Sequence, residues 1–281
     1  MISKQDIVVL LAYFLGYSTA RNTVFRLRRK PVTRFLTFHD ITPGNTRCFE
    51  EKLLFLSRKT NVLNIDDFFL GRLSLSKINV VLTFDDGYKG WVTNGIPILK
   101  RLKLPAIFFV SSGFVGLSKE SESEFVRSKL FVKLPFREIT GGLNSDELRM
   151  IVDEGFAIGG HTLNHSILSE IEDKNELKNE IYGDKVKLEK IIGKQINYFS
   201  YPSGAYQNSK VDLVEVLKKS GYRGAVTILS GPNDFGSNPF LLCRELTNAD
   251  MPLKVFKARV LGNMDAIQTM KKVQKMFLKL S

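Results

Sequence analysis

Six apolar runs, separated by stretches with helical spacing, constrain the fold of this chain more than any other feature. The runs cover residues 35–39, 80–84, 106–111, 156–160, 196–201 and 224–228. Helical spacing between them is clearest at 49–58, 92–102, 145–154 and 168–192. Strands that alternate with helices in this way form a parallel sheet or barrel. With 281 residues, 43% of them hydrophobic, the chain can bury the core of one large α/β domain.

Two adjacent carboxylates follow the second apolar run. Asp85 and Asp86 stand where this run ends, and Gly87 predicts the turn that leaves the strand. Buried carboxylates are costly unless charged or hydrogen-bonding partners meet them. Successive side chains of an extended segment point to opposite sides, so we expect the two acids to meet different partners. One of them could bind a metal while the other moves a proton. Solvated acids in a turn or helix cap are the alternative interpretation.

Two of the three histidines in the chain, His161 and His165, lie four residues apart after the fourth run. This spacing lets both rings bind one cation, either from one face of a helical turn or from a tight loop, with Asp86 or Asp85 as the oxygen ligand. The glycines at 159–160 are expected to let the backbone come close to the site. Two histidines and one carboxylate suit catalytic zinc and also non-haem ferrous iron. A pair of surface histidines at a helix start is the alternative.

These segments resemble the motifs of the polysaccharide deacetylases, carbohydrate esterase family four. Thr-Phe-Asp-Asp-Gly at 83–87 matches the first motif, and His-Thr-Leu-Asn-His at 161–165 matches the second. Phe-Ser-Tyr-Pro-Ser-Gly at 199–204 resembles the third motif. The resemblance extends from about residue 35 to about residue 246. It implies a distorted, incomplete (β/α) barrel of about seven strands, with the chemistry at the C-terminal ends of the strands.

The resemblance also implies a role for each matching residue. Asp85 corresponds to the general base of the family, and the metal ligands correspond to Asp86, His161 and His165. The backbone N–H that stabilises the oxyanion corresponds to that of Ser203. The rest of the third motif is expected to bind substrate along one wall of the groove: Tyr201, Pro202 and Gly204. The implied cofactor is a divalent metal, with zinc first and cobalt, nickel or iron as alternatives.

The third motif departs from the common family pattern at two positions. Ser200 stands where many members have an arginine that orients the base, and Ser203 stands where many have an aromatic residue. Arg244, on a predicted late strand, is the candidate to pair with Asp85 in place of the missing arginine.

The general acid is the other departure. Many members supply it from a late Leu-x-His motif, but no histidine follows His165 in this chain. His39 ends the first predicted strand and is the candidate, because the poly-N-acetylglucosamine deacetylase branch takes this histidine from its first strand. That branch also tends to have Tyr-Pro in its third motif, as at 201–202. A hydrogen bond of His39 to Asp40 or to backbone, without any catalytic role, is the alternative.

The chain is predicted to have three segments. Residues 1–33 form an apolar and basic helical segment, 34–262 the catalytic domain, and 263–281 an amphipathic basic helix whose apolar stripe is expected to pack on the barrel. Within the domain, 114–143 is predicted to be an insertion that forms part of the substrate cleft, or else a surface helix without substrate contact. Cys48 and Cys243 do not make a disulfide framework.

The net charge of +12 is concentrated near the two ends of the chain. The apolar run at 7–17 is too short to span a bilayer, although it has the length of a signal-peptide core. We favour an uncleaved helix in the membrane interface, with the following arginines on phosphate headgroups. This predicts a cytoplasmic protein, peripheral to the inner face of the membrane; an exported or cell-envelope protein is the alternative. No nucleic-acid-binding motif is visible, so nucleic acid is not an expected partner.

The predicted function is metal-dependent hydrolysis of the N-acetyl group of an N-acetylated glycan, polymeric, oligomeric or lipid-linked, with release of acetate. A catalytically weakened carbohydrate-binding member of the same fold is one alternative, because of Ser200, Ser203 and the missing late histidine. A non-sugar amidase is another. A ferrous oxygenase matches less well, because it has no use for a base beside the metal.

Overall fold

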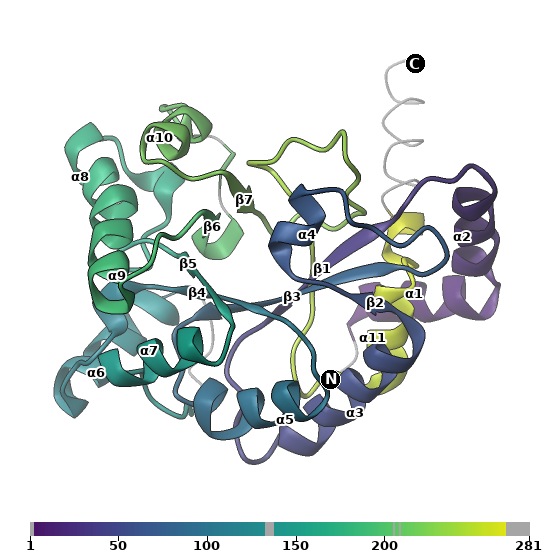
Figure 1. The fold of residues 1–281 in the computed structure, drawn as a ribbon, viewed down its shortest axis with the longest axis horizontal. Helices are drawn as coiled ribbons and strands as arrows, with labels where there is room; N and C mark the ends of the chain where they lie inside the picture. The colour runs from purple at the N-terminus through teal and green to yellow at the C-terminus, as the bar shows by residue number, and fades with distance from the viewer. Residues whose placement is uncertain (1–2, 133–137, 205, 208, 268–281) are drawn as a thin grey trace.

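The computed structural model describes residues 3–132, 138–204, 206–207 and 209–267, and parallel strands form its centre (Figure 1). The strands are β1 (Thr33–Phe38), β2 (Asn61–Val62), β3 (Asn79–Asp86), β4 (Ile107–Val110), β5 (Ala157–Gly160), β6 (Tyr198–Ser200), β7 (Gly224–Val226) and β8 (Arg244–Leu246). Their order is β7-β6-β5-β4-β3-β1-β8, with β2 paired to β3 off this path. A parallel bridge between Val226 and Leu242 brings the two edges of the sheet together. The sheet is therefore a (β/α) barrel with one seam, as the motifs predicted.

Helices surround the strands (Figure 1). They are α1 (Lys4–Phe14), α2 (Tyr17–Leu27), α3 (Thr46–Lys59), α4 (Ile65–Phe69), α5 (Ile96–Arg101), α6 (Lys119–Phe125), α7 (Ser145–Asp153), α8 (Lys174–Lys178), α9 (Asp184–Ile192), α10 (Leu213–Lys219) and α11 (Leu253–Val260). All six strands predicted from the apolar runs are present. The helix predicted over 168–192 is wrong at its start: residues 168–170 form a separate turn, and the helix begins at Lys174 because the side chain of Asp173 caps it.

Alternate side chains of the strands enter two different cores. Phe84 packs in the larger core, which also contains residues of α3, α5, α7 and α9 and so lies between the strands and the helices. Val81 belongs to a smaller core, built from strand residues and from α4, that lies inside the barrel. By the same alternation Asp85 continues the inward series of Val81, whereas Asp86 belongs to the series of Phe84. The two adjacent carboxylates therefore leave the strand in different directions.

The predicted N-terminal segment consists of α1 and α2, which lie beside α11 and are bent by 63° from each other (Figure 1). No single helix in the described part of the chain is long and apolar enough to cross a membrane, although α1 and α2 together have the length and composition of a broken span. Of the predicted C-terminal helix, residues 264–267 are helical, and 268–281 lie outside the described residues.

Candidate metal centre and active site

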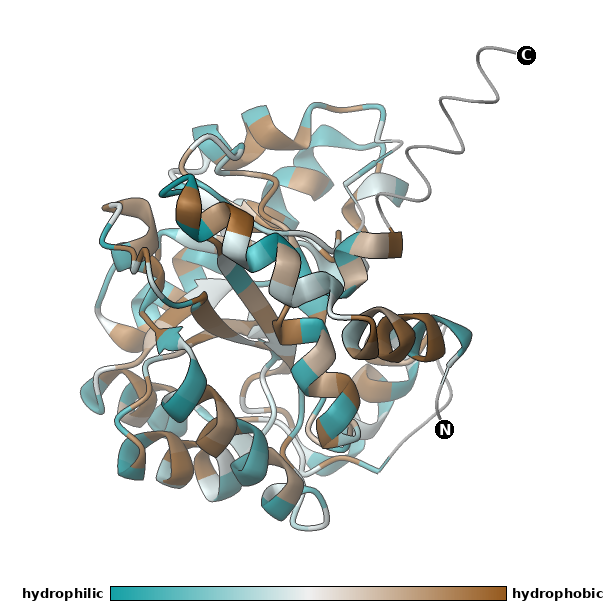
Figure 2. Cartoon of the chain, turned by 90° about the vertical axis from the view of Figure 1, so that its right-hand side faces the viewer, coloured by the Kyte–Doolittle hydropathy of each residue, from teal (hydrophilic) through white to brown (hydrophobic). Residues whose placement is uncertain are grey.

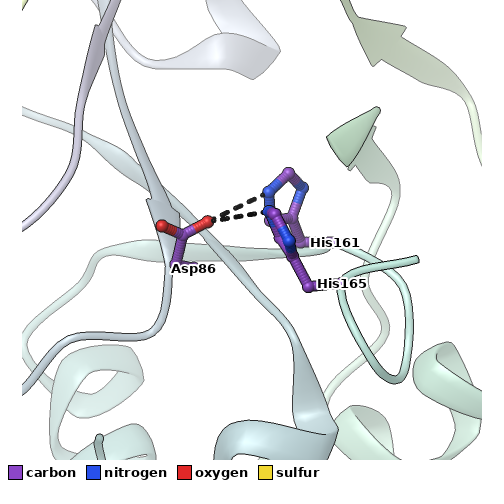
Figure 3. Close-up of side chains that lie close together, drawn as sticks. All are labelled: Asp86, His161 and His165. Atoms are coloured by element: carbon purple, nitrogen blue, oxygen red, sulfur yellow. Dashed lines mark ion pairs between the residues drawn. The ribbon is translucent and has the colours of Figure 1, made fainter. Parts of the chain in front are cut away.

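Three side chains that the sequence singled out converge at the C-terminal ends of β3 and β5 (Figure 3). Oδ1 of Asp86 lies 3.3 Å from Nε2 of His161 and 3.4 Å from Nε2 of His165. One ligand atom of each residue lies within 4.8 Å of the other two. Asp86 ends β3 and His161 follows β5 directly, while a tight loop, not a helical face, returns His165 to the site. The geometry has the ligand types and the spacing of a metal centre.

Hydrogen bonds at Nδ1 determine how both imidazoles face Asp86. Nδ1 of His161 lies 2.7 Å from the carbonyl oxygen of Ser200, and Nδ1 of His165 lies 3.0 Å from that of Lys129. A carbonyl oxygen only accepts, so we assign the proton to Nδ1 in each ring. Each neutral ring then presents the lone pair of Nε2 to the carboxylate of Asp86. Three facing acceptors repel one another unless a proton or a metal ion lies among them, and carbonyl acceptors on the far nitrogen are usual for histidines that bind metals.

The electrostatics of the three side chains agree with a cation site. Burial raises the pKa of Asp86, but when protons occupy Nε2 of His161 and His165, the hydrogen bonds from these rings outweigh burial and hold the pKa well below its usual range. Burial lowers the pKa of His165, whereas the hydrogen bond to Asp86 and its charge raise it, and the net shift is upward. The ionised Asp86 therefore attracts a proton to His165, and a metal ion would compete with that proton.

Asp85 meets a different set of partners. Nη1 of Arg244 lies 2.8 Å from both carboxylate oxygens of Asp85, and the hydroxyl of Ser200 donates to one of them at 3.2 Å. Nη2 of Arg244 donates to Ser200 at 2.9 Å, and its Nε donates to the carbonyl of Thr227 at 2.7 Å. The contact predicted between Arg244 and Asp85 is thus present. Ser200, which replaces the arginine common in the family, bridges the two.

The same contacts keep Asp85 charged. Burial raises its pKa, but the charge of Arg244, followed by that of His161 and a hydrogen bond from Arg244, lowers it below its usual range. Asp85 is only 4% exposed, so this charge depends on protein partners and not on water.

His39, the candidate acid, follows β1 directly and is exposed. Because β1 and β3 pair in parallel, the end of β1 lies beside the two carboxylates. Accordingly, the charge of His39 contributes to lowering the pKa of both Asp85 and Asp86. Asp40, its alternative partner, instead accepts hydrogen bonds from the backbone and hydroxyl of Thr140. The position of His39 suits a proton donor, and its role stays a prediction.

The third motif forms a turn at the rim of the site. Ser203 is exposed, and together with His165 it borders a pocket of about 250 Å³. Tyr201, Pro202 and Gly204 are buried, and the ring of Tyr201 packs within the larger core. These three residues shape the turn that exposes Ser203, and their predicted contact with substrate stays a prediction. The role of the Ser203 N–H in binding an oxyanion stays a prediction.

The predicted insertion borders the same pocket. It contains α6 and a π-helical turn at Val126–Leu130, and its residues 133–137 are outside the described part of the chain. Residues 128–130 and Val132 line the pocket opposite 165–167. The carbonyl of Lys129 also holds the ring of His165, so the insertion contributes both to the pocket wall and to the metal centre.

Backbone strain is concentrated at this site. Among the described residues, six that are not glycine have positive φ, and four of the six lie here: Asp86 at 90°, Thr162 at 63°, His165 at 55° and Ser203 at 52°. Each such conformation costs on the order of 1–3 kcal/mol and persists only where the surroundings enforce it. The cost falls on residues in all three motifs.

Two buried carboxyl groups that the sequence did not reveal hold the histidine loop. Glu180 accepts from the backbone N–H of Asn164 at 2.9 Å and from its side-chain amide at 2.7 Å. Asp184 accepts from the backbone N–H of Ser112 at 2.9 Å and of His161 at 3.0 Å. Burial raises the pKa of Asp184 to about 7. Acids in a polar helical stretch give no sign in the sequence that they point inward.

The two glycines before His161 lie on β5 and leave room for close neighbours. A Cβ at Gly159 would clash with the ring of Phe109, and one at Gly160 would clash with the hydroxyl of Tyr222. The close approach seen here is to core side chains that pack against β5, and to Asp184, which binds the backbone N–H of His161.

Fold and site together define a class of protein, a (β/α) barrel with an Asp-His-His cluster at the ends of its strands, and comparisons identify the family. The sequence model of the polysaccharide deacetylase family matches residues 73–225, more than half of the chain. The matched residues include Asp85 and the Asp-His-His cluster, whereas His39 and Arg244 lie outside the match. The chain belongs to the polysaccharide deacetylase family, as its motifs predicted.

Individual relatives are distant in sequence and similar in fold. YxkH of Bacillus subtilis, named for the polysaccharide deacetylases, is 22% identical over 181 residues, 64% of this chain and 56% of YxkH. The chain thus spans little more than half the length of this relative. BC0361, a polysaccharide deacetylase from Bacillus cereus, has a TM-score of 0.64 at 22% identity, over 82% of this chain and 69% of its own. IcaB from Ammonifex degensii has a TM-score of 0.63 at 20% identity, over 82% of this chain and 97% of IcaB.

Proposed function

We propose that this protein is a metal-dependent deacetylase that hydrolyses the N-acetyl group of an N-acetylated sugar and releases acetate. One observation carries the proposal: the facing acceptors of Asp86, His161 and His165 lie next to a buried carboxylate, Asp85, that Arg244 keeps ionised. Membership of the polysaccharide deacetylase family supports the sugar substrate and the amide bond.

The donor set favours zinc. Two imidazole nitrogens and one carboxylate oxygen, with no fourth ligand from the cluster, match the three protein ligands typical of catalytic zinc. Cobalt, nickel and iron accept the same ligands. A divalent ion held by these residues supplies Lewis acidity, which polarises the acetyl carbonyl and activates water.

The residues of the chain then have distinct tasks. Asp85 takes a proton from the attacking water as general base, while Arg244 orients its carboxylate through two direct contacts. The backbone N–H of Ser203 donates to the carbonyl oxygen as it gains negative charge. His39 donates a proton to the sugar nitrogen as the amide C–N bond breaks. The acyl carbon thereby gains the hydroxyl of water, and acetate and a free amine leave.

Acetate release from a panel of N-acetylated sugars tests the proposal. The protein is incubated with zinc, cobalt or nickel and with monomeric, oligomeric, polymeric and lipid-linked substrates, and mass spectrometry follows the loss of acetyl groups. We expect loss of acetyl from at least one sugar class, and none from the Asp85→Asn control. Folded, metal-loaded protein that releases no acetate from any sugar contradicts the proposal. Binding without release would identify a carbohydrate-binding member, and release only from non-sugar amides an amidase.

A further inference from the structure

The α1–α2 pair leaves an apolar face uncovered. Of 17 exposed large hydrophobic side chains among the described residues, seven lie in its short span: Ile7, Val8, Leu11, Phe14, Leu15, Val24 and Leu27. Three of them are strongly exposed: Phe14 at 72%, Leu15 at 85% and Leu27 at 80%. Figure 2 looks at this side of the molecule and shows α1 as a hydrophobic helix at its surface. Exposed apolar side chains gathered on one helix pair in this way indicate an interaction surface.

The opposite face of the pair is fixed to the barrel. Val9 is fully buried in a small apolar cluster with residues of α11 and the segment after it. Asp6 accepts from the guanidinium of Arg259 at 2.7 Å, and the side-chain amide of Asn22 donates to the carbonyl of Leu261 at 3.1 Å. Crossing a bilayer would break these contacts and leave Arg259 without its acidic partner. The pair is therefore held against the domain, and its apolar face points outward.

Positive charge flanks the helix pair at the start of α1 and at the end of α2. Five basic residues of segment 3–30 are exposed: Lys4, Arg26, Arg28, Arg29 and Lys30. The only acid in this segment is Asp6, which is occupied by Arg259. Exposed apolar side chains flanked by basic ones complement an anionic lipid surface, because the apolar groups enter the acyl boundary and the cations meet phosphates. A second copy of the chain would bring the same positive charges against each other, which disfavours a dimer through this face.

We propose that the outer face of α1 and α2 binds an anionic lipid bilayer, so that the protein is peripheral to a membrane with α1 in the interface. This inference does not depend on the deacetylase activity, since none of its residues belongs to the candidate site.

Vesicle sedimentation with the full chain tests the proposal. Vesicles of equal parts phosphatidylglycerol and phosphatidylcholine are compared with vesicles of phosphatidylcholine alone. We expect at least roughly tenfold stronger partitioning to the anionic vesicles, since each cation near such a surface contributes about fivefold. Added salt should weaken it. The double variant Phe14→Glu/Leu15→Glu should lower partitioning by more than about tenfold, because two apolar side chains no longer enter the lipid.

A matched control separates lipid insertion from a change in net charge. Leu75→Glu/Phe235→Glu adds the same two charges at apolar residues that are 52% and 74% exposed elsewhere on the surface, and it should bind vesicles nearly as the native chain does. Circular dichroism checks that both variants are folded. Equal binding to neutral and anionic vesicles, or equal losses in the two variants, overturns the proposal. The proposal is also overturned if light scattering shows a native dimer and Phe14→Glu/Leu15→Glu dissociates it, because a second copy of the chain would then cover this face.

Discussion

Replacing Arg244 with methionine tests how the carboxylate next to the metal centre is kept charged. The substitution keeps much of the side-chain length but removes the donors to Asp85, Ser200 and the carbonyl of Thr227. Asp85 is 4% exposed, so bulk water does not replace the contacts that Arg244 makes with it. Breaking a buried ion pair by removing one member costs about 3–5 kcal/mol. We therefore expect the thermal midpoint of unfolding to fall by roughly 10 °C.

The pH dependence of activity should change in the same variant. In the native protein the pKa of Asp85 is depressed, so its contribution to stability is present above the unfolded-state pKa and is lost as pH falls through the folded-state pKa. Without Arg244, burial remains as the largest influence on Asp85 and acts to raise its pKa. The acid limb of kcat/KM, which reports the base of the free enzyme, should then move to higher pH.

The control is Arg259→Met, which breaks a partly buried pair with Asp6 at the N-terminal helices. It should also lower the melting temperature, but it should leave the acid limb unchanged. If the acid limb of Arg244→Met overlays that of the native protein, Arg244 does not keep the pKa of Asp85 low.

Three further variants test other parts of the site. Asp85→Asn should keep its metal and lose about 10²–10⁴-fold in kcat, since it removes the base alone; a substantial residual rate argues against that role. His39→Ala should slow hydrolysis of amides much more than of activated acetate esters, whose leaving groups need no proton, so equal slowing of both excludes it as the acid. Glu180→Ala should weaken zinc affinity by about 10–100-fold, because the loop at Asn164 loses both hydrogen bonds to the Glu180 carboxylate. The control Glu215→Ala, at an exposed glutamate, should leave zinc affinity unchanged. If zinc affinity is unchanged in both variants, Glu180 does not support the histidine loop.

The sequence predicted the barrel and the residues that converge in it because both follow from strand order. Asp85, Asp86 and His161 all stand at or just after the C-terminal end of a strand, and parallel strands bring those ends to one edge. The pairing of Arg244 with Asp85 could also be predicted from the sequence. A buried carboxylate without its usual arginine needs another cation, and a late strand carried one.

The strained backbone of the site and the buried acids behind it could not be predicted, because they depend on backbone geometry and not on residue pattern. Positive φ at Asp86 and His165 leaves no trace in the sequence, since these residue types also occur in ordinary loops. Glu180 and Asp184 lie in a polar helical stretch and are recognised as buried only when the histidine loop packs against them. Similarly, the burial of the Tyr201 ring in the core follows from the turn and not from the motif.

Zinc content per chain after dialysis, measured by elemental analysis, shows whether Asp86, His161 and His165 hold one ion together. We expect a stoichiometric zinc ion in the native protein, retention of it in Asp85→Asn, and its loss in His161→Ala and in His165→Ala. Folded His161→Ala and His165→Ala proteins that keep as much zinc as the native chain would show that these histidines do not form the metal centre.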